Sequence, residues 1–163
     1  GKLKESYKSL IDKFKASEIK MEEGLKSLKS QRGTVVDQLF KELHNQAFEK
    51  IDCLQCANCC KTTGPLLLPI DIQRLAKAKK MSSGVFLKTY LKLDEDEDWV
   101  FKSMPCPMLG ENNYCSVYED RPTACREYPH TDDGNMKQKL EITKKNCAIC
   151  PAVADIVTRL GNA

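Results

Sequence analysis

Four cysteines lie within eight residues of the chain in the pattern C-x-x-C-x-x-C-C, and they are Cys53, Cys56, Cys59 and Cys60. As thiolates, cysteines at this spacing can converge on one soft or borderline cation such as zinc or iron. The adjacent pair at the end of the pattern can point in two directions and serve two neighbouring metal ions. The sequence therefore predicts a metal-binding protein first.

Five more cysteines follow in the chain: Cys106, Cys115, Cys125, Cys147 and Cys150. A tetrahedral structural zinc site takes four nitrogen or sulfur ligands, so eight thiolates complete two closed sites, and a bridged pair of metals needs seven or eight. One partition joins part of the first block to a late cysteine at one metal and gives the remaining cysteines to the other. The sequence leaves this pairing open.

Two other uses of the cysteines are a disulfide framework and inert buried thiols. The odd number of nine cysteines, the lysine-rich composition and the lack of an apolar N-terminal signal segment disfavour disulfides. These features favour a cytoplasmic protein. The chain starts at Gly1 without a methionine, which is compatible with a removed leader.

Composition limits the remaining possibilities. The 163 residues, at 18.4 kDa, allow one compact domain with an appendage, and no apolar run is long enough to span a bilayer. The net charge of +3 comes entirely from residues 1–50, which hold eleven Lys and Arg against eight Asp and Glu. This excess is too small for a nucleic-acid interface, which needs clustered basic residues. We expect no nucleic-acid partner and no membrane.

The first fifty residues lack cysteine and proline and are predicted to be helical. In a first set of mostly apolar positions, the residues follow one another at steps of four and three, a spacing typical of a heptad seam. These are Leu3, Tyr7, Leu10, Phe14, Ser17, Met21, Gly24 and Leu28. A second helix after Gly33, with Thr34 and Asp37 resembling a capping box, carries another stripe. Its members are Val36, Leu39, Phe40, Leu43, Ala47 and Ile51.

The N-terminal segment (residues 1–50) is therefore expected to form a helical arm or hairpin. Its stripes suit a homodimer or a protein partner, because one long helix of thirty residues would reach about 45 Å, more than a small domain needs for cover. The alternative is a hairpin that only buttresses the rest of the chain.

Residues 51–163 are expected to form an irregular, metal-organised domain that is rich in cysteine. An extended segment between Pro65 and Pro69 precedes a helix capped by Asp71, and Ser82 or Ser83 starts another helix. The acidic run 94–98 lacks the glycine turn of a calcium loop and is expected to be a solvated linker, followed by a short strand at 99–101. The predicted fold class is mainly α with a small β content.

Three later blocks of sequence make a resemblance to a known family specific. They are Cys106-Pro, Cys115-Ser-Val-Tyr and Arg121-Pro-x-x-Cys125-Arg-x-Tyr-Pro129, and they follow the four-cysteine block in order. The chain resembles the YkgJ-type family of proteins described as zinc or iron chelators. The resemblance implies as metal ligands Cys53, Cys56, Cys59, Cys60, Cys106, Cys115 and Cys125, with Cys147 or Cys150 as a late ligand. His130 stands where the family often has an aromatic residue, and a solvent-facing or supporting role is expected for it.

Zinc is the first choice of metal, since it is redox-inert and suits all-thiolate sites, and iron or an iron–sulfur cluster is the alternative. A flagellin lysine methylase carries a similar cysteine cluster, which keeps an iron-dependent redox protein or modifying enzyme as the second hypothesis. No catalytic constellation is visible, and His44 is expected to be a solvated helix residue. Arg121 and Arg126 flank Cys125 and are expected either to offset thiolate charge or to form surface ion pairs.

Overall fold

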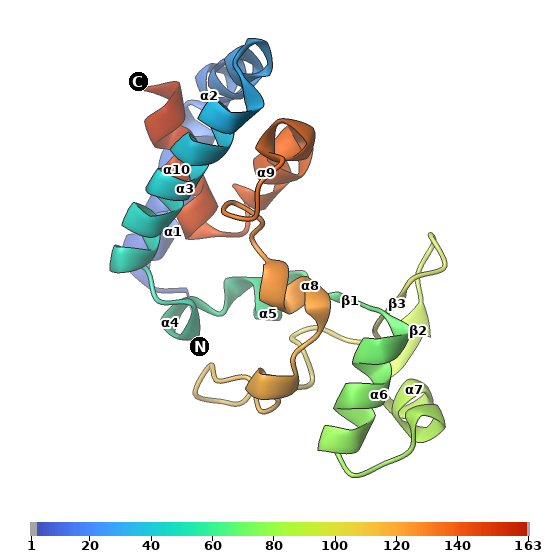
Figure 1. Ribbon diagram of the computed structural model, residues 1–163. Coiled ribbons are helices and arrows are strands. Elements are labelled where there is room, and N and C mark those ends of the chain that lie inside the picture. The colour runs from blue at the N-terminus through green and yellow to red at the C-terminus, as the bar shows by residue number, and fades with distance from the viewer. Residues whose placement is uncertain (1–2, 163) are drawn as a thin grey trace. The chain divides into compact units, whose positions relative to one another are not determined.

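The computed structural model describes residues 3–162, and the prediction of a mainly α fold with few strands is confirmed (Figure 1). The helices are α1 (Glu5–Ala16), α2 (Glu18–Ser27), α3 (Gly33–Lys50), α4 (Cys53–Cys56), α5 (Asn58–Thr62), α6 (Pro69–Ala78), α7 (Ser83–Tyr90), α8 (Thr123–Glu127), α9 (Leu140–Asn146) and α10 (Pro151–Gly161). The strands are β1 (Leu66–Leu67), β2 (Leu91–Leu93) and β3 (Trp99–Phe101). Short 3-10 turns occupy Leu28–Ser30, Tyr118–Asp120 and Met136–Lys139.

The chain forms two compact units. The bundle unit joins the residues up to Cys56 with those from Pro129 onward, and the insert unit runs from Ala57 to Tyr128. The sequence predicts a boundary between residues 1–50 and residues 51–163. The contacts group the N-terminal helices with the C-terminal segment. The reason is the apolar helix α10, which the N-terminal helices surround.

Helix α10 is the centre of the bundle unit and packs against α1, α2 and α3 (Figure 1). Pro151 occupies its first turn, where the missing N–H of proline costs no hydrogen bond. Seven of its eleven residues are buried, among them Val153, Ile156 and Val157 at 0% exposure. A helix buried on most of its faces forms the core of a unit instead of covering one side of it.

The heptad seam predicted for the N-terminal segment is used inside the bundle unit. Tyr7, Phe14, Met21 and Leu28 are buried in the same apolar core as α10. The predicted weak point at Ser17 is a break between α1 and α2, where the backbone leaves helical geometry at φ −133° and ψ 35°. The second weak point, Gly24, lies where α2 meets α10. A Cβ at Gly24 would lie 2.9 Å from the Cα of Gly161.

Helix α3 begins at Gly33, and the predicted capping box of Thr34 and Asp37 is wrong, because no side chain caps its N-terminus. The Asp37 carboxylate instead accepts hydrogen bonds from the backbone N–H groups of Asn135 (3.2 Å) and Met136 (2.9 Å). Asp37 therefore ties α3 to the segment that leads into α9.

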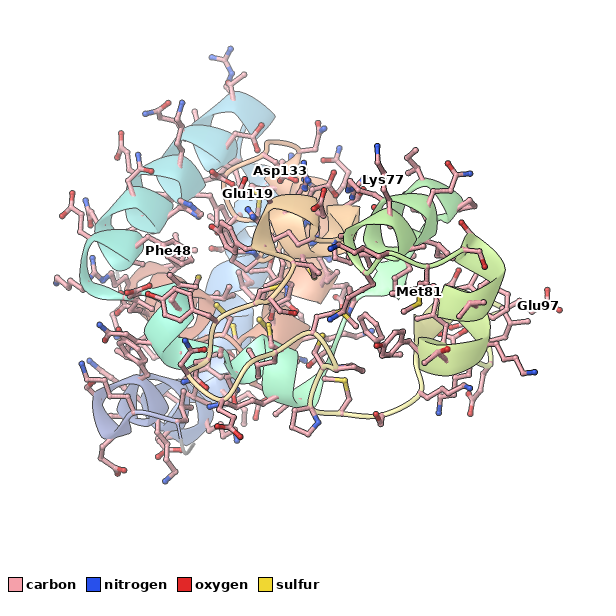
Figure 2. The ribbon with its side chains drawn as sticks, turned by 90° about the horizontal axis from the view of Figure 1, so that it is seen from below. Phe48, Lys77, Met81, Glu97, Glu119 and Asp133 are labelled. Carbon is pink, nitrogen blue, oxygen red and sulfur yellow. The ribbon has the colours of Figure 1, made fainter. Side chains whose placement is uncertain are left out.

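The insert unit has a three-stranded antiparallel sheet in the order β1-β3-β2, and α6 packs against α7. Its separate core includes Ile72, Leu75 and Phe86, with Met81 packed against it between the two helices (Figure 2). The predicted cap of α7 is confirmed, since the Val85 N–H donates to the Ser82 hydroxyl at 3.2 Å.

The acidic run joins β2 to β3 as a turn. The Asp94 carboxylate accepts the backbone N–H groups of Asp96 and Asp98, both at 2.9 Å, and Glu97 points outward from the turn (Figure 2). These carboxylates serve the turn itself, in line with the expected linker.

Replacing Gly24 by alanine should destabilise the bundle unit, because the added methyl group meets the backbone of α10. Overpacking typically costs about 1–3 kcal/mol, which exceeds the gain of about 0.5–1 kcal/mol that alanine brings to a helix. Thermal denaturation of the Gly24→Ala chain should show a lower Tm. Gly84→Ala is the control, since nothing lies within 4 Å of its added Cβ. A Tm that rises equally for both variants would contradict the close approach.

Candidate metal centres

The octet of cysteines is divided at Ala57. Cys53 and Cys56 occupy the single turn α4, and Cys59 and Cys60 lie on α5. Ala57 separates the two turns with a left-handed φ of 48°, a conformation that few residues other than glycine adopt. The division between the two compact units falls at this same residue, so the two halves of the octet belong to different units.

The bundle unit holds four cysteines in two C-x-x-C pairs, which we call the bundle group: Cys53, Cys56, Cys147 and Cys150. Cys147 ends α9 and is fully buried, and Cys150 precedes α10. The turn between them is closed by the Cys150 N–H, which donates to the Asn146 carbonyl at 2.8 Å. On the other side, the Asp52 N–H before α4 donates to the Tyr7 hydroxyl at 3.1 Å.

Burial dominates the protonation of Cys147 and Cys150. The pKa of Cys150 is raised to about 12, mainly by burial and also by the neighbouring thiolates of Cys53 and Cys56. The backbone N–H groups of Val153 and Ala152 oppose this by donating to the Cys150 sulfur. The C-x-x-C pairs thus lie close enough to repel one another as thiolates, although they come from opposite ends of a long stretch of sequence.

Cys147 follows the same pattern. Burial raises its pKa to about 12, and the charges of Cys150 and Glu18 add to the increase. Its thiol donates to the Thr143 carbonyl at 3.4 Å, as expected of a protonated sulfur. Without a cation between them, these thiols are held in the neutral form.

The insert unit holds the other five cysteines, which we call the insert group: Cys59, Cys60, Cys106, Cys115 and Cys125. All five are half-buried. The Cys106 N–H donates to the Cys60 carbonyl at 2.7 Å, which joins the segment after Pro105 to α5. Cys125 lies on α8.

A tight loop brings Cys106 and Cys115 together. Leu109 and Cys115 form an antiparallel bridge, and the Ser116 N–H donates to the Met108 carbonyl at 2.8 Å. Gly110 and Tyr114 close the loop through an N–H to carbonyl bond of 2.8 Å. The Asn112 carboxamide oxygen accepts the Tyr114 N–H at 3.1 Å, as asparagine does in turns.

The insert group shows the same mutual repulsion. The pKa of Cys106 is raised to about 11 and that of Cys125 to about 12, mainly by burial and also by the charge of the neighbouring Cys60 thiolate. Burial also raises the pKa of Cys115, again with a contribution from Cys60. The four cysteines Cys60, Cys106, Cys115 and Cys125 are therefore mutual neighbours.

Cys60 is the exception among the thiols. A hydrogen bond from the Cys59 side chain lowers its pKa to about 7, against the effect of burial, and Lys61 assists. Among the thiols of the described residues whose pKa is clearly shifted, Cys60 is the one whose pKa is lowered, which favours the thiolate at neutral pH.

Basic side chains offset charge near the insert group. Arg121 lowers the pKa of Cys115 and Cys125, and Lys79 lowers that of Cys115, although in each case burial outweighs them. Arg126 acts on the backbone instead, donating to the carbonyls of Arg121 (3.1 Å) and Glu119 (2.7 Å). The two arginines that flank Cys125 thus have different roles, and neither is limited to a surface ion pair.

Backbone N–H groups point at three of the sulfurs. Cys106 is approached by the N–H groups of Met108 and Leu109, and Cys115 by that of Val117. Cys150 receives those of Ala152 and Val153 in the same way. Hydrogen bonds to a thiolate favour its charged form, and supporting donors of this kind are common around metal-bound ligands.

The donor set fits zinc or iron, because both groups offer sulfur ligands supported by N–H donors. Within residues 3–162, no three side chains of the metal-ligating types are arranged to hold an ion as they stand.

The two histidines have oxygen partners within the bundle unit. His44 is more buried than expected, with its side chain 16% exposed, and its Nδ1 lies 2.6 Å from the Thr131 hydroxyl. His130 Nδ1 lies 3.7 Å from the Asp133 carboxylate. Both histidines join parts of the bundle unit.

Two features near the cysteines were missed in the sequence. Helix α10 was not predicted, although Pro151 followed by Val153, Ile156, Val157 and Leu160 has helical spacing. The link from Asp71 to Thr123 was also missed, because residues 52 positions apart gave no local signal.

A mainly α chain with neighbouring thiols gathered in each of two small units has the features of a cysteine-rich metal-binding protein. A model of the family CxxCxxCC, described as "Putative zinc- or iron-chelating domain", matches residues 52–151. The chain belongs to this family, and the membership supports metal binding without distinguishing zinc from iron.

No curated protein and no solved structure matches the chain. Across the part of the chain that the structure describes, every helix is too short or too polar to cross a bilayer.

The difference between Cys60 and the other thiols predicts selective alkylation. In the reduced, metal-free chain at pH 7.5, Cys60 should react with iodoacetamide before Cys125, because its pKa of about 7 leaves it largely as thiolate. Peptide mapping by mass spectrometry measures the order of reaction. Cys59→Ala should slow the reaction at Cys60 by removing the hydrogen bond. Equal rates at Cys60 and Cys125 would contradict the assignment.

Proposed function

We propose that the chain binds two metal ions through cysteine thiolates, one ion in each compact unit. Zinc is the first choice. The grouping of the thiols by unit carries the proposal, since each group contains at least the four sulfur ligands that a closed tetrahedral site needs.

In the bundle unit, the proposed ligands are the bundle group. Cys53 and Cys56 begin the matched region, and Cys147 and Cys150 end it. A bound ion would draw the two C-x-x-C pairs together and tie α4 to the start of α10. The N–H groups at the N-terminus of α10 would stabilise the Cys150 thiolate, as a helix N-terminus does for an anion.

In the insert unit, the proposed ligands are Cys60, Cys106, Cys115 and Cys125. The charges of Cys60, Cys106 and Cys115 each raise the pKa of at least one other member of this set, and all three raise that of Cys125, so a cation would relieve these thiols of mutual repulsion. Cys59 is proposed to support Cys60 through its hydrogen bond and to be the ninth, surplus thiol. Bound zinc would supply a redox-inert cross-link between these segments.

An iron–sulfur centre in a redox protein or modifying enzyme is the second candidate. The observation in its favour is the basic environment of the insert group, where Arg121, Lys79 and Lys61 each lower the pKa of a thiol. Such cations would offset the negative charge of a cluster held by four thiolates.

Association through the N-terminal helices and a cytoplasmic location remain predictions of the sequence. The seam expected to bind a partner is buried against α10 in the same unit. Its first contribution is therefore to the core of the bundle unit.

Metal analysis of anaerobically purified protein tests the proposal. We expect about two zinc ions per chain and no visible absorption. Cys150→Ser and Cys125→Ser should each lower the content by about one ion, because each removes a ligand from one site only. Plasma mass spectrometry gives the metal content, and an absorption spectrum of the same sample detects iron–sulfur clusters.

The matched control for these variants is Cys59→Ser, which should retain both ions. Iron with stoichiometric sulfide would replace zinc by the second candidate. Unchanged metal content in both Cys150→Ser and Cys125→Ser would overturn thiolate coordination by the proposed groups.

A further inference from the structure

Asp71 is a fully buried carboxylate, with its side chain at 0% exposure. Burying a charged group is costly unless hydrogen bonds and opposite charges replace its hydration. Asp71 has four donors within 3.0 Å: the Leu68 N–H, the Arg74 guanidinium, and both the N–H and the hydroxyl of Thr123. These contacts hold the pKa of the Asp71 carboxyl below its usual value although burial acts to raise it.

These hydrogen bonds make Asp71 the cap of two helices. Through the Leu68 N–H (2.9 Å) it closes the start of its own helix, α6. Through Thr123, at 3.0 Å from the N–H and 2.9 Å from the hydroxyl, it closes the start of α8. Helix α8 has no side-chain cap at its own N-cap residue, Pro122. The cap that satisfies its first turn therefore comes from α6.

The turn before α8 is held by the same pair of residues. Arg74, bound to Asp71 at 2.8 Å, also donates to the carbonyls of Asp120 (3.2 Å) and Arg121 (3.0 Å). Arg126 donates to Arg121 from the other side, at 3.1 Å. The bonds from Arg74 and Arg126 to these carbonyls hold the backbone before Cys125, and none of them ends on its sulfur.

We propose that Asp71 is a positioning residue of the insert-unit metal site, which holds α8 so that Cys125 faces Cys60, Cys106 and Cys115. This inference rests on the proposed function of the insert group. Cys125 lies two residues after Thr123 on a helix of five residues, so a loss of the cap frees the whole helix. The bundle group belongs to the other unit, and we expect it to keep its metal when this network is broken.

A positioning role for Asp71 can be distinguished from a general effect on the stability of the insert unit. A residue that only stabilises the insert unit would change metal binding no more than any other helix cap in that unit. Ser82, the cap of α7, provides the comparison, since its hydroxyl accepts the Val85 N–H at the start of a different helix of the same unit.

Cobalt titration of the full chain under anaerobic conditions tests the inference. Co²⁺ bound to thiolates gives charge-transfer and visible bands whose intensity per ion follows the number of sulfur ligands. Thr123→Val keeps the shape of the side chain and removes its bond to Asp71, and Thr123→Ser restores the hydroxyl. Asp71→Asn keeps the size of the acid and removes its charge.

We expect Thr123→Val and Asp71→Asn to weaken one of the two cobalt ions by about 10- to 100-fold, the range found for supporting residues around metal ligands. The affected ion should also lose thiolate charge-transfer intensity, while Thr123→Ser and Ser82→Ala retain the parental affinity for both. If Asp71→Asn does not fold, the Thr123 pair decides.

Two results would overturn the positioning role and leave the proposed function intact. One is unchanged binding of both ions by Thr123→Val, and the other is an equal loss in Ser82→Ala. A parental chain that binds neither Co²⁺ nor Zn²⁺ would overturn the proposed function together with this inference.

Discussion

The repulsion between crowded thiolates is the constraint on which the rest of the structure depends. Four of the nine cysteines lie in the bundle unit and five in the insert unit, and burial together with the charge of nearby thiolates raises the pKa of most thiols with a resolved shift. Apart from Cys60, the thiols with a resolved shift remain protonated at neutral pH unless a cation joins them. A metal ion reverses this balance, because it replaces several mutual repulsions by attraction to one centre. The N–H groups directed at Cys106, Cys115 and Cys150 already favour the charged form.

The two units use this constraint on different scaffolds. The bundle unit has a large apolar core around α10, and its cysteines lie where α4 and the α9–α10 turn meet that core. The insert unit is smaller and has its own apolar core, and Asp71, Arg74 and Arg126 fix the backbone before and within α8. Both place cysteines from distant parts of the chain beside one another. In each unit, a metal would add a cross-link where short elements and loops bury little apolar surface.

Local signals in the sequence predicted much of this arrangement. The heptad seam, the cap at Ser82 and the strand at 99–101 each depend on neighbouring residues, and the structure contains all three. The packing of the N-terminal helices on α10 and the bonds from Asp71 to Thr123 depend on contacts between distant segments. No periodicity reveals such contacts. The predicted capping box of Thr34 and Asp37 was wrong because of another contact between distant segments. The Asp37 carboxylate accepts hydrogen bonds from the backbone N–H groups of Asn135 and Met136. The division of the octet follows from the backbone of Ala57, an alanine whose left-handed conformation its residue type does not suggest.

We propose that the thiols bind two metal ions, one in each compact unit. Proton–cadmium correlation NMR of the chain loaded with ¹¹³Cd tests this proposal most directly. Scalar coupling through the metal–sulfur bond links each ion to the β-protons of its own ligands. We predict two cadmium resonances, one correlated with Cys53, Cys56, Cys147 and Cys150 and the other with Cys60, Cys106, Cys115 and Cys125. A single resonance, or one resonance correlated with cysteines of both sets, would contradict the account.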